Sequence, residues 1–466
     1  MKGSLLGLAL MLVVPLVPAA TTVGATEAAA RSPIEHTIIV YQENISFDHY
    51  FGTFGHGSAG IPDGALVTHS PSNAAYSPFR LDGQTQDITC DVDHGYADMI
   101  KMADHGAMDM YTQFGNDKAV ADPSSASSST CPSLESQPAG PALSLGYYDG
   151  APGAASAPLQ NYWNLASHYT LADNFFQGVY GPSTPGAEWL VAATNNTVGD
   201  PNPLNDKCES DYAGSMPQQD IPNLGSEASS AGVSWAWFQG GFGACTTTAT
   251  NGYSAHHDPF QYFTSTADLN HNWAYDPNFA YADPSQHQRD LSLLDDALDG
   301  TAVGGTIPTL PSISWVKAPT EADGHPKTSG PAEDDRFIGD LVNRVKASPY
   351  WGHTAIIVAF DETGGWWDHV APPELTGNFA PWDSGSPNLT GCQYPGNGAA
   401  CGEGGFGPRM PVLVISPHAR KQFVDHDQMD TASLDRWVEW DYGLPALGVW
   451  GDRDVNAGSL RGAFDF

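Results

Sequence analysis

The sequence predicts an α/β fold in which a largely parallel sheet is covered by helices. The first observation is residues 355–360, six consecutive apolar residues that do not alternate with polar ones. The second is residues 34–41, a run rich in β-branched side chains. Unbroken apolar runs bounded by turn residues are typical of strands buried on both faces, as in parallel sheets. The third observation is that oxygen-bearing side chains directly follow both runs.

Further segments supply strands and helices for this architecture. Residues 311–316 and 410–416 have the composition of buried strands. Residues 332–348 and 430–440 are predicted helices, because they have helical spacing or a capping residue at the start. Residues 162–176 are expected to form one amphipathic helix.

The charge of the chain excludes one class of partner. Its 466 residues contain 18 Lys and Arg against 53 Asp and Glu, which gives a formal net charge of -35. Such a surface repels nucleic acids and anionic bilayers at neutral pH. We therefore expect no nucleic-acid partner. The length is sufficient for a substantial core, in one large domain or two smaller ones.

The N-terminus has the features of a secretory signal. Lys2 precedes an apolar stretch at residues 5–14, and small residues follow it. This stretch is too short to span a bilayer and fits a signal peptide over residues 1–30. No later apolar run approaches the length of a membrane span. The sequence therefore predicts a secreted protein, extracellular or periplasmic, without stable membrane insertion.

The cysteines are even in number, which in an exported protein predicts three disulfides. Short separation favours Cys392 with Cys401 and Cys208 with Cys245, but six cysteines allow 15 pairings and the sequence does not choose among them. No two cysteines have the C-x-x-C spacing of a zinc site. The six are Cys90, Cys131, Cys208, Cys245, Cys392 and Cys401.

The polar residues after the two apolar runs are candidate metal ligands. Glu43 and Asn44 follow the first run, and Asp361 and Glu362 follow the second. Ligands of open α/β sheets bind beyond the carboxyl ends of the strands, and hard divalent ions take oxygen ligands. The sequence therefore predicts one divalent cation, whether Ca, Mg, Mn or Zn. A helix cap at Glu43 and Asn44, and an acidic strand cap at the other pair, are the structural alternatives.

Ser183 and Thr184 are candidate nucleophiles. They lie in a Gly-Pro-Ser-Thr-Pro turn, which holds a hydroxyl on a rigid backbone, although most such turns have no further role. His256 and His257 are adjacent and precede Pro259. From residue type alone, these histidines can equally be surface residues or braces of a loop.

Four motifs in order resemble the bacterial phosphoesterase family of phospholipases C and respiratory-burst-inhibiting acid phosphatases. Residues 43–52, ENISFDHYFG, are similar to the signature that opens the family, and residues 361–370 to its late acidic motif, with Thr363 where His is commoner. Residues 407–417 and 463–466 match as well. The resemblance runs from about residue 34 to the C-terminus.

The resemblance implies a fold and a domain organisation. The expected fold is a three-layer α/β/α sandwich with a mixed, largely parallel central sheet, as in alkaline phosphatase. Residues 31–466 are then a single phosphoesterase domain. Gly-, Pro- and Ser-rich composition places loop insertions at about residues 117–160, 198–250 and 374–406, and the second of these contains one strand-like piece, residues 232–239.

The resemblance also assigns catalytic roles. Ser183 matches the family nucleophile, two residues before Pro185, while Gly186 and Ala187 depart from the commoner Asn and larger side chain. The histidines that match active-site positions are His94, His256, His257 and His325. Together with the cation, these would supply positive charge for an anionic substrate, and attack by Ser183 would give a phosphoserine intermediate.

The predicted function is an acid phosphatase that hydrolyses phosphomonoesters, because the low pI and the histidines fit acid-range hydrolysis. The alternative is a phospholipase C that hydrolyses phosphatidylcholine-like phosphodiesters. The partner is then a small phosphoester or a phospholipid, and the oligomeric state stays open. A serine esterase is disfavoured by the absence of a G-x-S-x-G motif, and a secreted calcium-binding protein by the absence of an EF-hand-like loop.

Overall fold

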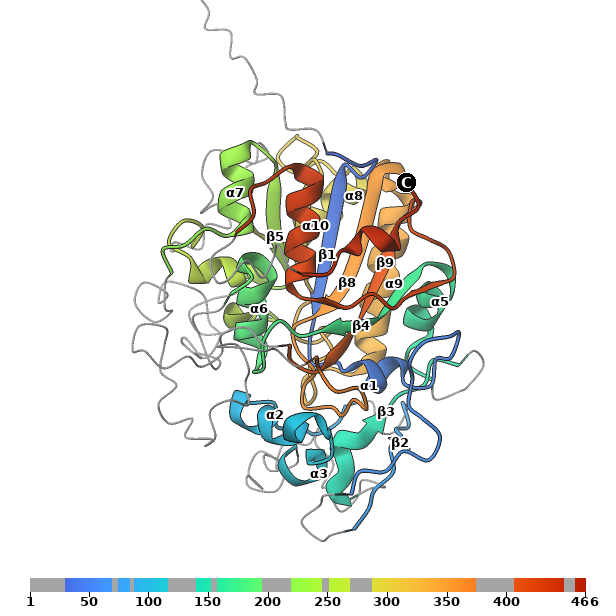
Figure 1. The fold of residues 1–466 in the computed structure, drawn as a ribbon. Helices are drawn as coiled ribbons and strands as arrows, with labels where there is room; N and C mark the ends of the chain where they lie inside the picture. The colour runs from blue at the N-terminus through green and yellow to red at the C-terminus, as the bar shows by residue number, and fades with distance from the viewer. Residues whose placement is uncertain are drawn as a thin grey trace, which may run out of the picture.

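The computed structural model describes most of the chain outside its N-terminus. The described residues are 30–68, 74–83, 88–115, 140–151, 157–194, 219–244, 251–268, 287–373, 406–447 and 457–466. The predicted signal peptide therefore lies outside the described residues, apart from residue 30. The described residues surround one large sheet, with helices on both sides of it (Figure 1).

The sheet has nine strands in the order β10-β4-β9-β8-β1-β7-β5-β6, with β11 also paired to β4. β9 is antiparallel to both β4 and β8, and the other pairs are parallel. The predicted mixed, largely parallel sheet is confirmed. The strands are β1 (His36–Gln42), β4 (Thr170–Phe176), β5 (Trp235–Gln239), β6 (Gln288–Asp290), β7 (Ile313–Lys317), β8 (Thr354–Phe360), β9 (Arg409–Ile415), β10 (Phe423–Asp425) and β11 (Met429–Asp430).

The helices form two layers, one on each face of the sheet. Residues an odd number apart on a strand point to opposite faces. Trp437 of α10 donates to Thr37 of β1 over 3.3 Å, whereas Gln42 of β1 donates to Asp334 of α9 over 2.8 Å. The near layer in Figure 1 holds α6 (Ser183–Ala192), α7 (Leu224–Ala231) and α10 (Ala432–Tyr442), and the far layer α5 (Gln160–His168), α8 (Leu291–Asp299) and α9 (Pro331–Ala347).

A smaller region covers the carboxyl edge of the sheet. It contains the helices α1 (Phe47–Phe51), α2 (Tyr96–Ala103) and α3 (Tyr111–Phe114) and the two-stranded pair β2 (Phe79–Arg80) and β3 (Gly146–Tyr147). In Figure 1 this region lies below the large sheet. It places residues from the first third of the chain over the ends of the central strands.

The register of the central strands determines which side chains meet at this edge. β8 is completely buried, which is why its sequence lacks polar alternation. Gln42 pairs with Phe360, so Glu43 and Asp361 are the next residues of two strands in register. On the other side of β1, Val40 pairs with Val316, which sets Lys317 beside Tyr41. Glu43, Asp361 and Lys317 therefore emerge close together.

A buried ion-pair network connects three of the sequence motifs, residues 43–52, 361–370 and 407–417. Arg409 at the start of β9 donates to both carboxylate oxygens of Asp368, at 3.0 and 3.2 Å, and to Asp48 Oδ1 at 3.2 Å. His369 Nδ1 lies 2.7 Å from Asp48 Oδ2. Breaking such a pair leaves an uncompensated buried charge, so these motif residues hold α1 and β9 to the loop after β8.

Two predictions about chain organisation need correction. The predicted helix at residues 162–176 ends at His168, and residues 170–176 form β4. Pairing with β9 and β10 outweighs the local helical pattern, since backbone groups of a buried segment need hydrogen-bond partners. Within the predicted insertion at 198–250, α7 and β5 belong to the core, because β5 pairs with β7 and β6 in the main sheet.

Other parts of the predicted insertions, residues 117–139, 198–218, 245–250 and 374–405, lie outside the described residues. Cys90 is the one cysteine in the described part of the chain, where it is buried and disulfide-bonded. Because the other five cysteines lie outside that part, the three-disulfide pattern stays a prediction. Among the described helices, none has the length and apolar character needed to cross a bilayer.

Candidate active site

Two carboxylates lie side by side at the carboxyl edge of the sheet. Glu43 and Asp361 are both buried and follow β1 and β8 in register. Burial and the negative charge of Glu43 raise the pKa of Asp361 well above its usual value. Burial also acts to raise the pKa of Glu43, but the charges of His257 and Lys317 outweigh it and lower that pKa. The pair therefore holds one negative charge firmly and resists a second until a cation binds.

Asp361 has one oxygen anchored and one left for a ligand. Its Oδ1 accepts from the backbone N–H groups of Asn44, at 2.8 Å, and Glu362, at 2.7 Å. Its Oδ2 is buried and accepts no hydrogen bond from a described residue. Asn44 has φ 60°, a left-handed conformation that Asn tolerates better than most residues. The amide of Asn44 is also buried without a hydrogen bond to a described residue.

These orphaned oxygens fit a divalent cation. Buried polar atoms are nearly always satisfied, so unsatisfied carboxylate and amide oxygens on neighbouring strand ends indicate a missing partner. Oxygen-only donors of this kind suit a hard cation. Glu43, Asn44 and Asp361 are the residues that the geometry groups most closely.

Glu362, the fourth predicted ligand, has a different setting. Its Oε2 accepts from the backbone N–H of Gly364, and its Oε1 lies 3.9 Å from His94 Nε2. Three groups in the described part of the chain bring His, Asp or Glu ligand atoms within 4.8 Å of one another, and none combines Glu362 with Glu43 or Asp361. Glu362 Oε1 therefore lies beside His94 at the edge of this cluster.

The two candidate nucleophiles point to different surroundings. Ser183, at the start of α6, donates from Oγ to Glu43 Oε2 over 3.0 Å. Thr184 Oγ1 lies 3.4 Å from the carbonyl of His256 and 3.4 Å from the hydroxyl of Tyr262. The hydroxyl of Ser183 thus faces the carboxylates, and that of Thr184 faces a loop.

Gly186 explains how α6 comes so close to the carboxylates. A Cβ atom on Gly186 would lie 2.3 Å from the backbone oxygen of Asp361. Only glycine permits this approach, which brings the first turn of α6 against the end of β8. Glycine at this position therefore has a steric reason in this chain.

The paired histidines lie on the same side of the site as Ser183. His257 Nδ1 is 3.3 Å from Glu43 Oε1. Burial lowers the pKa of His257 even though the charge of Glu43 acts to raise it. His256 is half-buried, with its ring 4.0 Å from that of His257 and Nδ1 3.2 Å from Ser254 Oγ. His257 is thus held at the carboxylates, and His256 lies next to it.

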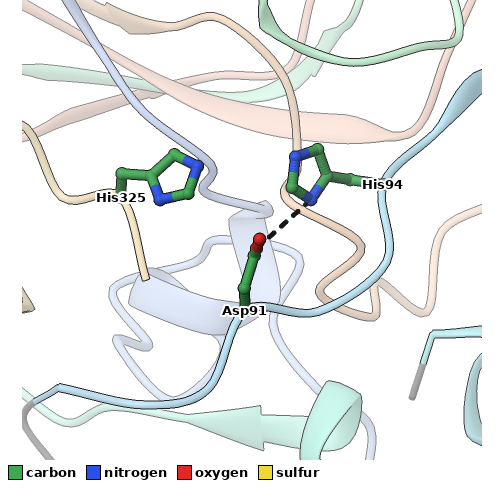
Figure 2. Close-up of side chains that lie close together, drawn as sticks. All are labelled: Asp91, His94 and His325. Atoms are coloured by element: carbon green, nitrogen blue, oxygen red, sulfur yellow. Dashed lines mark ion pairs between the residues drawn. The ribbon is translucent and has the colours of Figure 1, made fainter. Parts of the chain in front are cut away.

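The other two histidines meet over Asp91. Figure 2 shows His94 and His325 side by side with Asp91 below them; their ring centroids lie 6.0 Å apart and the rings are nearly perpendicular, at 79°. His94 Nδ1 lies 3.5 Å from Asp91 Oδ1 and 2.7 Å from the carbonyl of Val92. Burial acts to lower the pKa of His325, but the charges of Asp91 and other nearby carboxylates outweigh it and raise that pKa.

Asp91, His94 and His325 have ligand atoms within 4.8 Å of one another, which is close enough for a metal ion. The Nδ1 atoms of the histidines lie 2.7 and 2.6 Å from the carbonyls of Val92 and Pro326. Carbonyl oxygens accept only, so each Nδ1 carries a proton and does not offer a lone pair toward Asp91. The other ring nitrogen, Nε2, lies 3.9 Å from Glu362 Oε1 in His94, and in His325 it is the atom that can meet a ligand.

Sequence reasoning missed three residues of this site: Lys317, Asp91 and Asp323. Lys317 is fully buried and contacts Glu43 through its ammonium. The signal was present, because a lysine directly follows the apolar run of β7. Asp91 precedes His94 by three residues and Asp323 precedes His325 by two, and an acid near a candidate histidine is a detectable pattern.

Comparison with protein families identifies the chain. A model described as the phosphoesterase family matches residues 34–445. The chain belongs to this family. The match confirms the predicted family and supports the predicted enzyme class, a hydrolase acting on phosphoric ester bonds.

Several proteins that are similar to this chain are named as phospholipases C. The non-hemolytic phospholipase C of Pseudomonas aeruginosa is 25% identical over 96% of this chain and 62% of its own length. Phospholipase C A of Mycobacterium tuberculosis is 27% identical over 93% of this chain and 77% of its own length. The chain thus spans less than two thirds of the Pseudomonas relative.

Solved structures of low similarity include members of the alkaline phosphatase superfamily. One from Vibrio parahaemolyticus has a TM-score of 0.35 and 12% identity, and covers 65% of each chain. A lipoteichoic acid synthase of Listeria monocytogenes has a TM-score of 0.34 and 11% identity, over 65% of this chain and 71% of its own. The confirmed fold class follows from the strand order and helix layers described above.

Proposed function

We propose that this chain is a metal-dependent phosphodiesterase of the phospholipase C type, with Ser183 as its nucleophile. Its substrate would be a phospholipid with a phosphorylated headgroup, cleaved between the glycerol oxygen and phosphorus. The observation that carries the proposal is the 3.0 Å contact between Ser183 Oγ and Glu43 Oε2, in a buried carboxylate cluster at the strand ends. The names of the relatives support the substrate class.

The cation site is proposed to consist of Glu43, Asn44, Asp361 and Glu362. The unsatisfied oxygens of Asn44 and Asp361 support it, as does the raised pKa of Asp361, caused by burial and by Glu43. A divalent ion bound there would offset phosphoryl charge as a Lewis acid and favour ionisation of the Ser183 hydroxyl. Its binding would displace the proton that Asp361 holds.

Ser183 is favoured over Thr184 for two reasons. Its hydroxyl faces the carboxylates, whereas Thr184 faces His256 and Tyr262. It is also the first residue of α6, a helix of ten residues, whose N-terminus carries partial positive charge and favours a phosphate group. Attack of Oγ on phosphorus would form a phosphoserine ester and break the bond to the glycerol oxygen.

His325 is proposed to protonate the leaving alkoxide. Its Nδ1 is fixed by the carbonyl of Pro326, so Nε2 is the atom that meets the substrate, and nearby carboxylates favour its charged form over the effect of burial. The neutral imidazole would then accept a proton from the water that hydrolyses the phosphoserine. His94, His256 and His257 are proposed to contact or orient the phosphoryl group.

An assay of three substrates tests the proposal. Phosphatidylcholine vesicles, p-nitrophenylphosphorylcholine and p-nitrophenyl phosphate are compared for the wild type, with and without chelator, and for Ser183→Ala. We expect the two phosphodiesters to be hydrolysed and the chelator and the substitution each to abolish most turnover. Selective hydrolysis of p-nitrophenyl phosphate would instead support the acid phosphatase. Activity that survives exhaustive chelation would overturn the metal dependence.

A further inference from the structure

Glu43 faces two different groups with its two oxygens. Oε2 accepts from the Ser183 hydroxyl at 3.0 Å. Oε1 contacts the ammonium of Lys317 and lies 3.3 Å from His257 Nδ1. A carboxylate in this position has the geometry of a bridge between two cationic centres. One centre is the proposed cation site, and the other is occupied by Lys317.

The second centre has the donors of a metal site. Glu43, His257 and Asp323 place ligand atoms within 4.8 Å of one another, and all three are buried. Both ring nitrogens of His257 lack a hydrogen bond to any described residue. Two carboxylates and an imidazole are ligands that suit zinc. By residue type alone, this group predicts a second ion.

Lys317 supplies the positive charge of that centre. Its side chain is fully buried and extends from the end of β7 to Glu43. Its Nζ forms an ion pair with Glu43 Oε1, and both side chains are buried. A buried ammonium persists only where carboxylates compensate it.

A second ion would compete with Lys317 for the same ligand. Lys317 already contacts Glu43 Oε1, and Glu43 belongs both to the proposed cation site and to the group with His257 and Asp323. A second divalent ion beside Lys317 would add like charge next to a buried ammonium, which is strongly unfavourable in an interior of low effective dielectric.

We propose that the ammonium of Lys317 occupies the position of a second divalent cation and so keeps this a one-metal centre. Lys317 acts as a positioning residue, because it holds Glu43 Oε1 and leaves Oε2 toward Ser183. The inference rests on the proposed function for the first cation, at Glu43, Asn44, Asp361 and Glu362. It adds that Glu43, His257 and Asp323 bind a second ion only when Lys317 is removed.

Zinc content tests the inference without using activity. The wild type, Lys317→Ala, the double variant Lys317→Ala/His257→Ala and the control Lys346→Ala are dialysed against zinc and then against metal-free buffer. Zinc and protein are quantified by plasma mass spectrometry. Lys346 is exposed on α9, so its loss removes the same charge away from the site. We expect one ion per chain in the wild type and in the control, two in Lys317→Ala, and one in the double variant.

Folding of each variant is checked by circular dichroism. A folded Lys317→Ala that keeps one ion would overturn the inference. If that variant does not fold, the zinc content of the wild type is compared with that of His257→Ala instead. Equal contents support the inference. Two ions in the wild type and one in His257→Ala would overturn it. A wild type without any zinc, manganese, magnesium or calcium would contradict the proposed function instead, since the first site would then be absent.

Discussion

The contact between α6 and β8 gives a prediction whose size follows from a distance. In Gly186→Ala, the new Cβ would lie 2.3 Å from the backbone oxygen of Asp361, whereas ordinary contact begins at 3.4 Å. The first turn of α6 must therefore withdraw by about 1 Å, and Ser183 moves with it. Misplacement of a reacting group by about 1 Å can cost about 100-fold in rate. We expect kcat to fall by about that factor, or about 2.7 kcal/mol of transition-state stabilisation.

The assay is steady-state hydrolysis of p-nitrophenylphosphorylcholine, with metal content measured on the same samples. Metal content should stay at the wild-type value, because the proposed ligands come from β1 and β8 rather than from α6. Gly352→Ala is the matched control, since a Cβ at Gly352 meets nothing within 4 Å. A wild-type kcat in a correctly folded Gly186→Ala would show that the position of α6 does not limit the reaction.

Three further predictions address the nucleophile, the cation and the pH dependence of stability. Ser183→Ala should lower kcat at least about 100-fold, and Thr184→Ala far less; the reverse order in kcat would make Thr184 the nucleophile. Asn44→Ala should weaken manganese binding, measured by calorimetry, because it removes a ligand with no other partner among the described residues; an unchanged affinity would remove Asn44 from the site. Burial raises the pKa of Asp334 to about 7 from 3.8, so its contribution to stability is complete below about pH 4 and is lost as the pH rises to about 7. Asp334→Asn should therefore lose less free energy of unfolding between pH 5 and pH 8 than the wild type does; equal losses in urea titrations would refute this origin.

The sequence predicts the centre of this fold well because its strands are buried on both faces. β1, β7, β8 and β9 have continuous apolar runs, and each lies within a residue or two of the range expected from those runs. The polar residues directly after β1 and β8 also lie at one edge, as expected for parallel neighbours.

β4 could not be predicted in the same way. Its residues continue the pattern of α5, and only pairing with β9 and β10 makes them a strand. Such pairing joins segments more than two hundred residues apart, which no local pattern contains. The sequence likewise gives no indication that Asp91 lies under His325, since this contact depends on how the small region covers the sheet.

Lys317 was missed for a different reason. A lysine at a strand end is most often a solvated residue, and a buried lysine is rare unless carboxylates surround it. The carboxylates around this one are Glu43 after β1, Asp323 after β7 and Asp361 after β8. Its role depends on the register of β7 against β1, which the sequence does not fix.

The most direct test of the account is to identify the covalent intermediate. The wild type is mixed with p-nitrophenylphosphorylcholine, quenched in acid during turnover and digested, and the peptides are analysed by mass spectrometry. The account predicts a phosphocholine adduct on Ser183, absent after chelation and absent in Ser183→Ala. An adduct on Thr184 or a histidine, or turnover that Ser183→Ala leaves undiminished, would contradict it.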